Sequence, residues 1–243
     1  RGKKGFSDYY LREYVAWSYT VSNTIATRYY PCGFLWDVRG SGIFDKSNML
    51  YYLESLISSK IGIKLLRVNN STPSCQVENI IQFPIIVDNN YKSKIDELVV
   101  INNTLSRDDW DSFELSWDFG EHPFIRWSKA LCDATAIGAT MQHYYGSQPE
   151  VKSPVELCFM LWQGECGERF EKLKANEEEL NRIFIDIYGL QDELTPEVED
   201  DAVTVRLADK ERDVRSFISY IIGVAMGRYS LDVPCLAYAG GEW

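Results

Sequence analysis

Side chains of the kinds that read DNA bases and neutralise phosphates are spread over the first third of the chain. Arginine and lysine pair with guanine or with phosphate, and asparagine and glutamine pair with adenine. Such residues stand in predicted turns and near predicted helix ends: Arg28, Arg39, Lys46, Lys64, Arg67, Asn69, Asn70 and Gln76. Any one of them, taken alone, is more often a solvated surface residue than a DNA contact. The set therefore predicts DNA contact more strongly than its members do.

Charge divides the chain in the same place. The net charge of -11 argues against nucleic-acid binding if it is taken as an average. Residues 1–107, however, carry 13 Lys and Arg against 9 Asp and Glu, a net charge of +4. Residues 108–243 carry 12 against 27, a net charge of -15. We predict that only the first part faces a polyanion and that the acidic part serves spacing and protein contacts. Two ordinary solvated surfaces are the simpler alternative.

The sequence lacks the motifs of the common catalytic sites. It contains no phosphate-binding Gly-x-x-x-x-Gly-Lys loop, no Gly-x-Gly-x-x-Gly, no Gly-x-Ser-x-Gly and no Pro-Pro pair. His122 and His143 have no patterned nucleophile beside them, so a stand-alone enzyme such as a nuclease is disfavoured. No Cys-x-x-Cys pair occurs, and we predict no metal site and reduced thiols for the scattered cysteines Cys32, Cys75, Cys132, Cys158, Cys166 and Cys235.

The candidate residues must be positioned by a small β-rich region with one packed helix. Aromatic and β-branched runs predict strands over residues 15–21, 24–30 and 34–38. An apolar stripe at steps of three and four predicts a helix over residues 48–66. A polar loop over residues 69–74 follows, and residues 77–87 are predicted to be extended, with Pro84 at a strand edge or end.

The rest of the chain is predicted to be helical. Two heptad series, over residues 91–105 and 166–187, favour helices that pack along one another, and we interpret them as an antiparallel spacer. Two amphipathic helices on an ordinary core are the alternative. Ser153-Pro-Val-Glu156 predicts the start of a helix that runs to Tyr188 and stops at Gly189, although Gly164 and Gly167 could break it.

Two further segments complete the predicted α+β fold. Trp110, Phe113 and Trp117 share one face of a short helix predicted over residues 106–119, and such a stripe usually belongs to a core. A last helix is predicted over residues 209–229. We therefore predict a small mixed β-domain with a packed helix over residues 1–88, joined to a helical spacer and a C-terminal helical region over residues 89–243.

Several stretches resemble the C-terminal region of large adenine-specific DNA methyltransferases, namely the type IIG restriction-modification enzymes and the methyltransferase of BREX phage-defence systems. The resemblance is carried by residues 176–198, 209–232 and 236–243, by Asp109-Trp-Asp-Ser-Phe113 and by Ser116-Trp-Asp-Phe119. The first half, with Trp17-Ser18, Gly33-Phe-Leu-Trp-Asp37, Gly42-Ile-Phe44 and Gln76-Val-Glu-Asn-Ile80, resembles the Taq-type specificity domain of the same enzymes.

The resemblance implies a target-recognition module that contacts double-stranded DNA in the cytoplasm, without membrane contact. The Asn-Pro-Pro-Tyr motif and the glycine-rich S-adenosylmethionine motif of these enzymes are missing, and in relatives they lie upstream. We therefore expect a fragment that begins at Arg1 of a longer protein and neither binds this cofactor nor methylates DNA alone. Its partner would be the upstream methyltransferase domain of the same chain, and the parent would methylate adenine N6 and, if of type IIG, also cleave DNA. The alternative is an acidic helical scaffold that docks other defence-system proteins.

Overall fold

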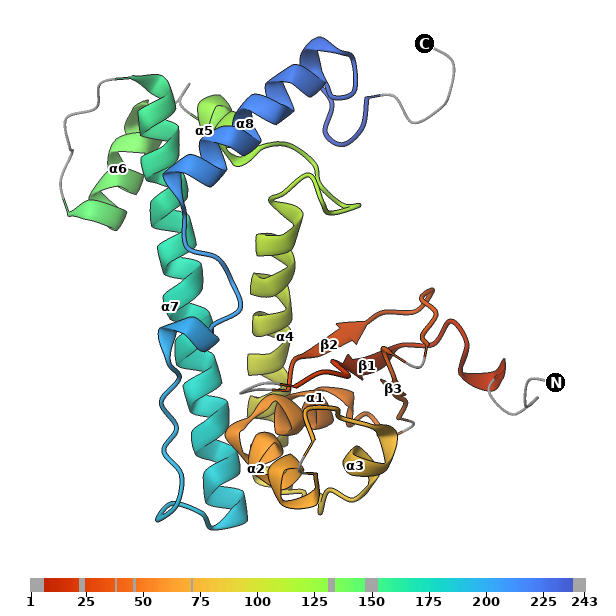
Figure 1. The fold of residues 1–243 in the computed structure, drawn as a ribbon. Coiled ribbons are helices and arrows are strands. Elements are labelled where there is room, and N and C mark those ends of the chain that lie inside the picture. The colour runs from red at the N-terminus through yellow and green to blue at the C-terminus, as the bar shows by residue number, and fades with distance from the viewer. Residues whose placement is uncertain are drawn as a thin grey trace. The chain divides into compact units, whose positions relative to one another are not determined.

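The computed structural model describes residues 7–21, 25–37, 39–45, 47–70, 72–130, 134–146 and 153–237. These residues form a small antiparallel sheet and eight α-helices, which confirms the predicted α+β class (Figure 1). The chain divides into two compact units. Unit 1 comprises residues 1–104 and 174–203, and unit 2 comprises residues 105–173 and 204–243. The functional boundary at residue 88 stays a prediction.

Unit 1 contains a three-stranded antiparallel sheet in the order β2-β1-β3. β1 is Tyr14–Trp17, β2 is Thr27–Tyr30 and β3 is Gly42–Ile43, and a short 3-10 helix, Ser7–Tyr9, precedes them. All four residues of β1 are buried, as expected for a central strand. The third strand was predicted over residues 34–38, and this is wrong for residues 34–37, while residue 38 lies outside the described residues. Asp37 Oδ1 instead accepts hydrogen bonds from the amides of Arg39 and Gly40, at 2.8 and 3.0 Å, and forms a turn before β3.

Three helices follow the sheet: α1 Leu50–Ser58, α2 Lys60–Asn69 and α3 Val77–Ile81. The helix predicted over residues 48–66 is therefore interrupted. Ser59 takes an extended conformation (φ -70°, ψ 167°), and its hydroxyl caps α2 by accepting a hydrogen bond from the Gly62 amide. Residues 77–87 were predicted to be extended. This is wrong for residues 77–81, which form helix α3, and residues 83–88 have no regular structure.

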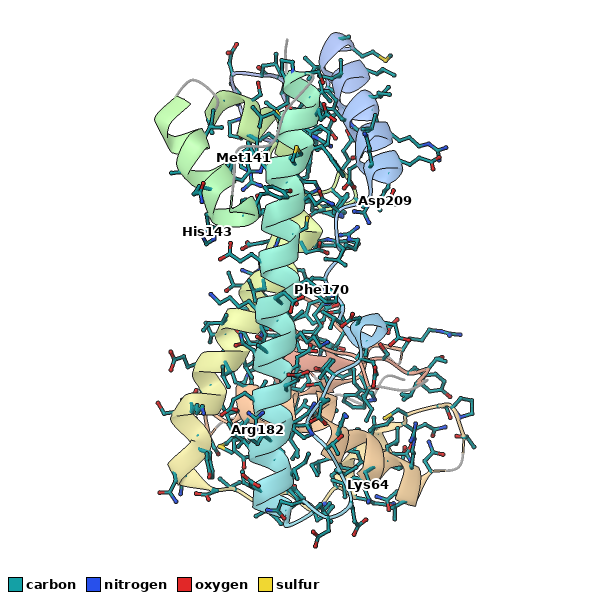
Figure 2. The ribbon with its side chains drawn as sticks, turned by 90° about the vertical axis from the view of Figure 1, so that its left-hand side faces the viewer. Lys64, Met141, His143, Phe170, Arg182 and Asp209 are labelled. Atoms are coloured by element: carbon teal, nitrogen blue, oxygen red, sulfur yellow. The ribbon has the colours of Figure 1, made fainter. Side chains whose placement is uncertain are left out.

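The predicted antiparallel packing of the two heptad series is confirmed within unit 1. Helix α4, Asn89–Asp111, and helix α7, Pro154–Tyr188, lie side by side there, with Arg182 on α7 (Figure 2). Their shared core is Tyr52, Leu56, Ile61, Ile95, Val99, Leu180, Ile183, Phe184 and Ile185. The polar interruption at Asn102 is satisfied, because Asn176 Nδ2 donates to Asn102 Oδ1 at 2.7 Å.

Helix α7 is continuous over the predicted range. The Ser153 hydroxyl accepts a hydrogen bond from the Glu156 amide at 3.2 Å, and Gly189, at φ +64°, ends the helix. Gly164 does not break it. A Cβ atom there would lie 2.3 Å from the ring of Tyr144, so this glycine makes room for helix α6, Ala134–Tyr145. No helix in the described ranges is long and apolar enough to cross a membrane.

Unit 2 adds helices α5, Pro123–Ala130, and α8, Lys210–Ala225, around the first half of α7. One core cluster contains Phe124, Cys158, Trp162 and Cys166, and a second contains Phe119, Tyr220 and Tyr229. The aromatic stripe was predicted to be core. Only Phe113 packs inward, whereas Trp110 is half-exposed and Trp117 is fully exposed. The three aromatic side chains do not share one helix face because α4 ends at Asp111 and the following residues form turns.

Candidate nucleic-acid interface

Four of the eight predicted DNA-binding residues come together where α2 ends. Arg67 and Asn69 occupy its last turn, Asn70 is its C-terminal cap, and Gln76 caps α3 on the other side of the connection. We call residues 67–76, with residue 71 outside the described ranges, the α2–α3 connection. The structure thus assembles Arg67, Asn69, Asn70 and Gln76 on one short surface segment of unit 1.

Side chains of the α2–α3 connection fix its own shape. Asn70 Oδ1 accepts from the Thr72 amide at 2.9 Å and from the Thr72 hydroxyl at 2.7 Å, while Asn70 Nδ2 donates to the Ser74 carbonyl. Gln76 accepts from the backbone of Asn79, and the Gln76 amide donates to Asn79 Oδ1 at 2.8 Å. Asn70 and Gln76 are therefore already engaged in a turn and in a capping box.

The connection is anchored to the chain that continues β1. The Val21 amide donates to the Pro73 carbonyl at 2.8 Å, and the Cys75 amide donates to the Tyr19 carbonyl at 2.7 Å. Trp17 Nε1 donates to the Cys75 carbonyl at 3.0 Å. Burial raises the pKa of the Cys75 thiol to about 11, so this cysteine is an inert part of the core. The described residues of the connection are thus a platform that hydrogen bonds hold against the end of β1.

Arg67 and Asn69 project from this platform. Both residues are exposed, and neither side chain forms a hydrogen bond or ion pair with the described residues. Arg67 also sits in the last turn of α2, where a cation is favoured by the helix dipole. Sequence reasoning missed the apolar neighbours Val68 and Ile81, which are 77% and 76% exposed. Val68 could have been noticed because it lies outside the apolar stripe that ends at Leu65.

Lys64 lies one turn earlier on α2 and is paired. Its ammonium forms an ion pair with Glu193, and both side chains are partly exposed. Lys64 is labelled in Figure 2. Asn181 holds the same acidic segment in place, because it accepts from the Lys60 amide at 2.9 Å and donates to the Pro196 carbonyl at 3.1 Å. An exposed pair of this kind contributes little, about 0–1 kcal/mol, so a phosphate group can compete with Glu193.

The other three candidates lie on different elements. Arg28 is exposed on β2 opposite Ala16, and Arg39 is exposed in the turn that Asp37 caps. Lys46 lies outside the described residues. Arg28 also faces Glu54. Burial raises the pKa of Glu54 to about 7. Hydrogen bonds from Asn103 and the Tyr29 backbone, and the charge of Arg28, act in the opposite direction and lower this pKa.

The charge division along the sequence is not a division between the compact units. Residues 1–104 carry 12 Lys and Arg against 9 Asp and Glu, but residues 174–203 of the same unit add 2 against 10. Unit 1 is therefore acidic as a whole. Within unit 1, helix α2 carries the cations Lys60, Lys64 and Arg67.

Unit 2 contains a buried ionic cluster that is structural. Asp109 accepts from the Arg206 amide at 3.2 Å and from Arg206 Nε at 3.0 Å, and Arg169 Nη1 lies 3.8 Å away. Glu165 accepts from Arg169 at 2.8 Å. The charges compensate one another, and burial lowers the pKa of nearby His122 to about 4. Within the described ranges, no group of three metal-ligating side chains is present.

Comparisons with known proteins agree with the resemblance. No protein-family model matches the chain. The chain is 40% identical, over 244 residues and its whole length, to the adenine-specific methyltransferase PglX of Lacticaseibacillus casei (strain Zhang). It is 25% identical, over 252 residues and 96% of its length, to the adenine-specific methyltransferase BrxX of Escherichia coli O9:H4 (strain HS). The chain spans 18% of the length of each relative. It is therefore similar, along nearly all of its length, to one part of two adenine-specific methyltransferases.

Proposed function

We propose that the chain is the DNA target-recognition part of a BREX-type, adenine-specific methyltransferase. The observation that carries this proposal is the α2–α3 connection, where a fixed turn presents unpaired Arg67 and Asn69 beside exposed apolar side chains. Arginine reads guanine, asparagine reads adenine, and apolar groups contact the thymine methyl. The catalytic and S-adenosylmethionine-binding groups belong to the rest of the parent protein in this proposal, since the chain has neither motif.

The eight predicted residues have different tasks in this proposal. Arg67 and Asn69 contact bases or phosphates directly. Asn70 and Gln76 shape the platform through their own hydrogen bonds. Arg28, Arg39 and Lys64, with Lys46, supply phosphate contacts, which set the orientation of the duplex rather than its sequence.

Replacing Arg67 or Asn69 with alanine should impair site-specific methylation by the full-length methyltransferase. Each base contact is expected to contribute about 1–3 kcal/mol, which corresponds to a loss of roughly 5- to 150-fold in kcat/KM at the cognate sequence. Methylation of mismatched sites should change much less. The measurement is the rate of methyl transfer to duplexes with the cognate site and with single substitutions in it.

Lys172→Ala is the matched control for these variants. Lys172 is an exposed cation on α7 in unit 2, and its removal should leave both rate and specificity unchanged. Equal losses from Lys172→Ala and Arg67→Ala would contradict the placement of recognition at the end of α2.

The Lys64–Glu193 pair gives a second test. In Glu193→Gln the Lys64 ammonium is released for phosphate, so DNA affinity at low salt should rise up to about fivefold and the salt dependence should steepen by about one unit. The Lys64→Ala change in the Glu193→Gln background should cancel both effects. Filter binding against salt concentration measures them, and a Glu193→Gln gain that persists without Lys64 would contradict this mechanism.

An acidic protein-interaction scaffold is the second candidate function. It is favoured by the acidic residues 174–203 of unit 1. The same titration discriminates between the two functions. A recognition module loses DNA affinity steeply as salt rises, whereas a scaffold shows no DNA affinity to lose.

A further inference from the structure

Helix α8 exposes an apolar face that the described residues of unit 2 leave uncovered. Its inner side packs through Val214, Phe217, Tyr220 and Val224. A second stripe, at steps of three and four, is exposed to solvent and consists of Ile218, Ile221, Ile222, Ala225 and Met226. Asp209, which caps the start of α8, is labelled in Figure 2. We call this stripe the α8 outer face.

A neighbouring turn extends the apolar surface. The Ser219 hydroxyl donates to Glu114 Oε2 at 2.8 Å, which places the turn over residues 112–118 beside α8. Ser219 lies three residues before Ile222, so the two side chains share one side of α8. The same turn carries Leu115 and the fully exposed Trp117. Exposed apolar side chains on α8 and on this turn are candidates for a protein interface.

The charges around the α8 outer face restrict what can cover it. The neighbouring turn carries Glu114 and Asp118, whereas on α8 Arg215, three residues before Ile218, pairs with Glu211. Unit 2 as a whole carries 11 Lys and Arg against 17 Asp and Glu. The apolar stripe and the net negative charge of unit 2 favour a protein surface over a DNA backbone.

We infer that the α8 outer face, with Leu115 and Trp117, docks an apolar surface of the remaining methyltransferase polypeptide. This inference rests on the proposed function. It is supported by the length of polypeptide outside the structure, because the chain spans 18% of each relative. Docking through unit 2 would hold the recognition module on the enzyme by protein contacts and leave the end of α2 in unit 1 for DNA.

Hydroxyl-radical footprinting tests the inference without DNA. Met226 is 77% exposed and Trp117 is fully exposed, and both side chains oxidise readily. In the 243-residue chain both should be labelled rapidly, and in the full-length methyltransferase at least fivefold more slowly. Phe34, a half-exposed side chain of unit 1, corrects for differences in radical dose.

A variant separates docking from general protection. Ile222→Asp in the full-length protein should restore the labelling of Trp117 and Met226, whereas Lys210→Glu, a charge change at the exposed start of α8, should not. Equal labelling of both proteins, or protection already present in the 243-residue chain, would overturn the docking. Protection that appears only with DNA would overturn it as well. Because methylation is not the readout, each of these results leaves the test of Arg67 and Asn69 untouched.

Discussion

Replacing Asp109 with alanine is expected to destabilise unit 2 by about 3–5 kcal/mol, because it removes a buried carboxylate that pairs with Arg206 and lies beside buried Arg169. Asp109 is 5% exposed and Arg169 is 6% exposed. The Arg206 guanidinium reaches the carboxylate with Nε and the Asp109 carbonyl with Nη2, at 3.0 and 3.2 Å. Removal of the carboxylate also frees the segment that starts at Arg206 and leads into α8.

Asp108→Ala is the matched control, since this neighbouring carboxylate is exposed on the same helix. Hydrogen exchange read by mass spectrometry should show lost protection in α8 and in the first half of α7, with protection of β1 and α1 retained. Asp108→Ala should leave both regions unchanged. A loss below about 1 kcal/mol for Asp109→Ala would mean that solvent reaches the cluster and replaces the carboxylate.

The stretches that carry the family resemblance meet in this cluster. Asp109 and Phe113 belong to one of them, and the Arg206 guanidinium lies 3.7 Å from the centre of the Phe113 ring. Arg212, from another stretch, lies 5.3 Å from the same ring and pairs with buried Asp213 at 2.7 Å. These residues serve the folding of unit 2, and the DNA-reading residues proposed here lie in unit 1.

Local signals predicted the long helix and the class of fold. The Ser153 hydroxyl caps the start of helix α7, and a glycine with positive φ ends it. Both features depend on residues next to the helix ends, so the sequence reveals them. The break at Ser59 and the short helix α3 were missed because they depend on capping hydrogen bonds that residue types alone do not reveal. Trp117 was predicted to be buried for a similar reason. That prediction requires a helix that continues to residue 119, and the helix ends earlier.

The sequence predicted which types of residue lie at the candidate site, but not what each side chain does there. Asn70 and Gln76 have side chains suited to adenine, but in the fold they close a turn and cap α3. The partner of Lys64 lies 129 residues away in the sequence. Such pairing depends on which surfaces the fold brings together, and no spacing rule reveals it.

The stability of unit 1 is expected to fall as pH rises from about 5 to 8. Burial raises the pKa of Glu54 to about 7, and the pKa of Glu177 to about 7 as well. In the unfolded state the pKa of both glutamates lies near 4.5. Between these values the folded state retains protons that the unfolded state has released, so each rise in pH favours unfolding. Above pH 7 the loss of folding free energy levels off, at about 3 kcal/mol for each glutamate.

Glu54→Gln should therefore remove about half of this pH dependence, and Glu54→Gln with Glu177→Gln most of it. The glutamine at position 54 keeps an oxygen that can accept the hydrogen bond from Asn103, which in the native protein is 3.0 Å long. At pH 8 the single variant should be more stable than the native protein, and at pH 4 the two should be equal. Urea unfolding monitored by exchange of unit 1 peptides measures this, with exposed Glu97→Gln as the control. A single variant that is less stable at pH 8 would show that the Glu54 carboxylate is ionised and held by Arg28.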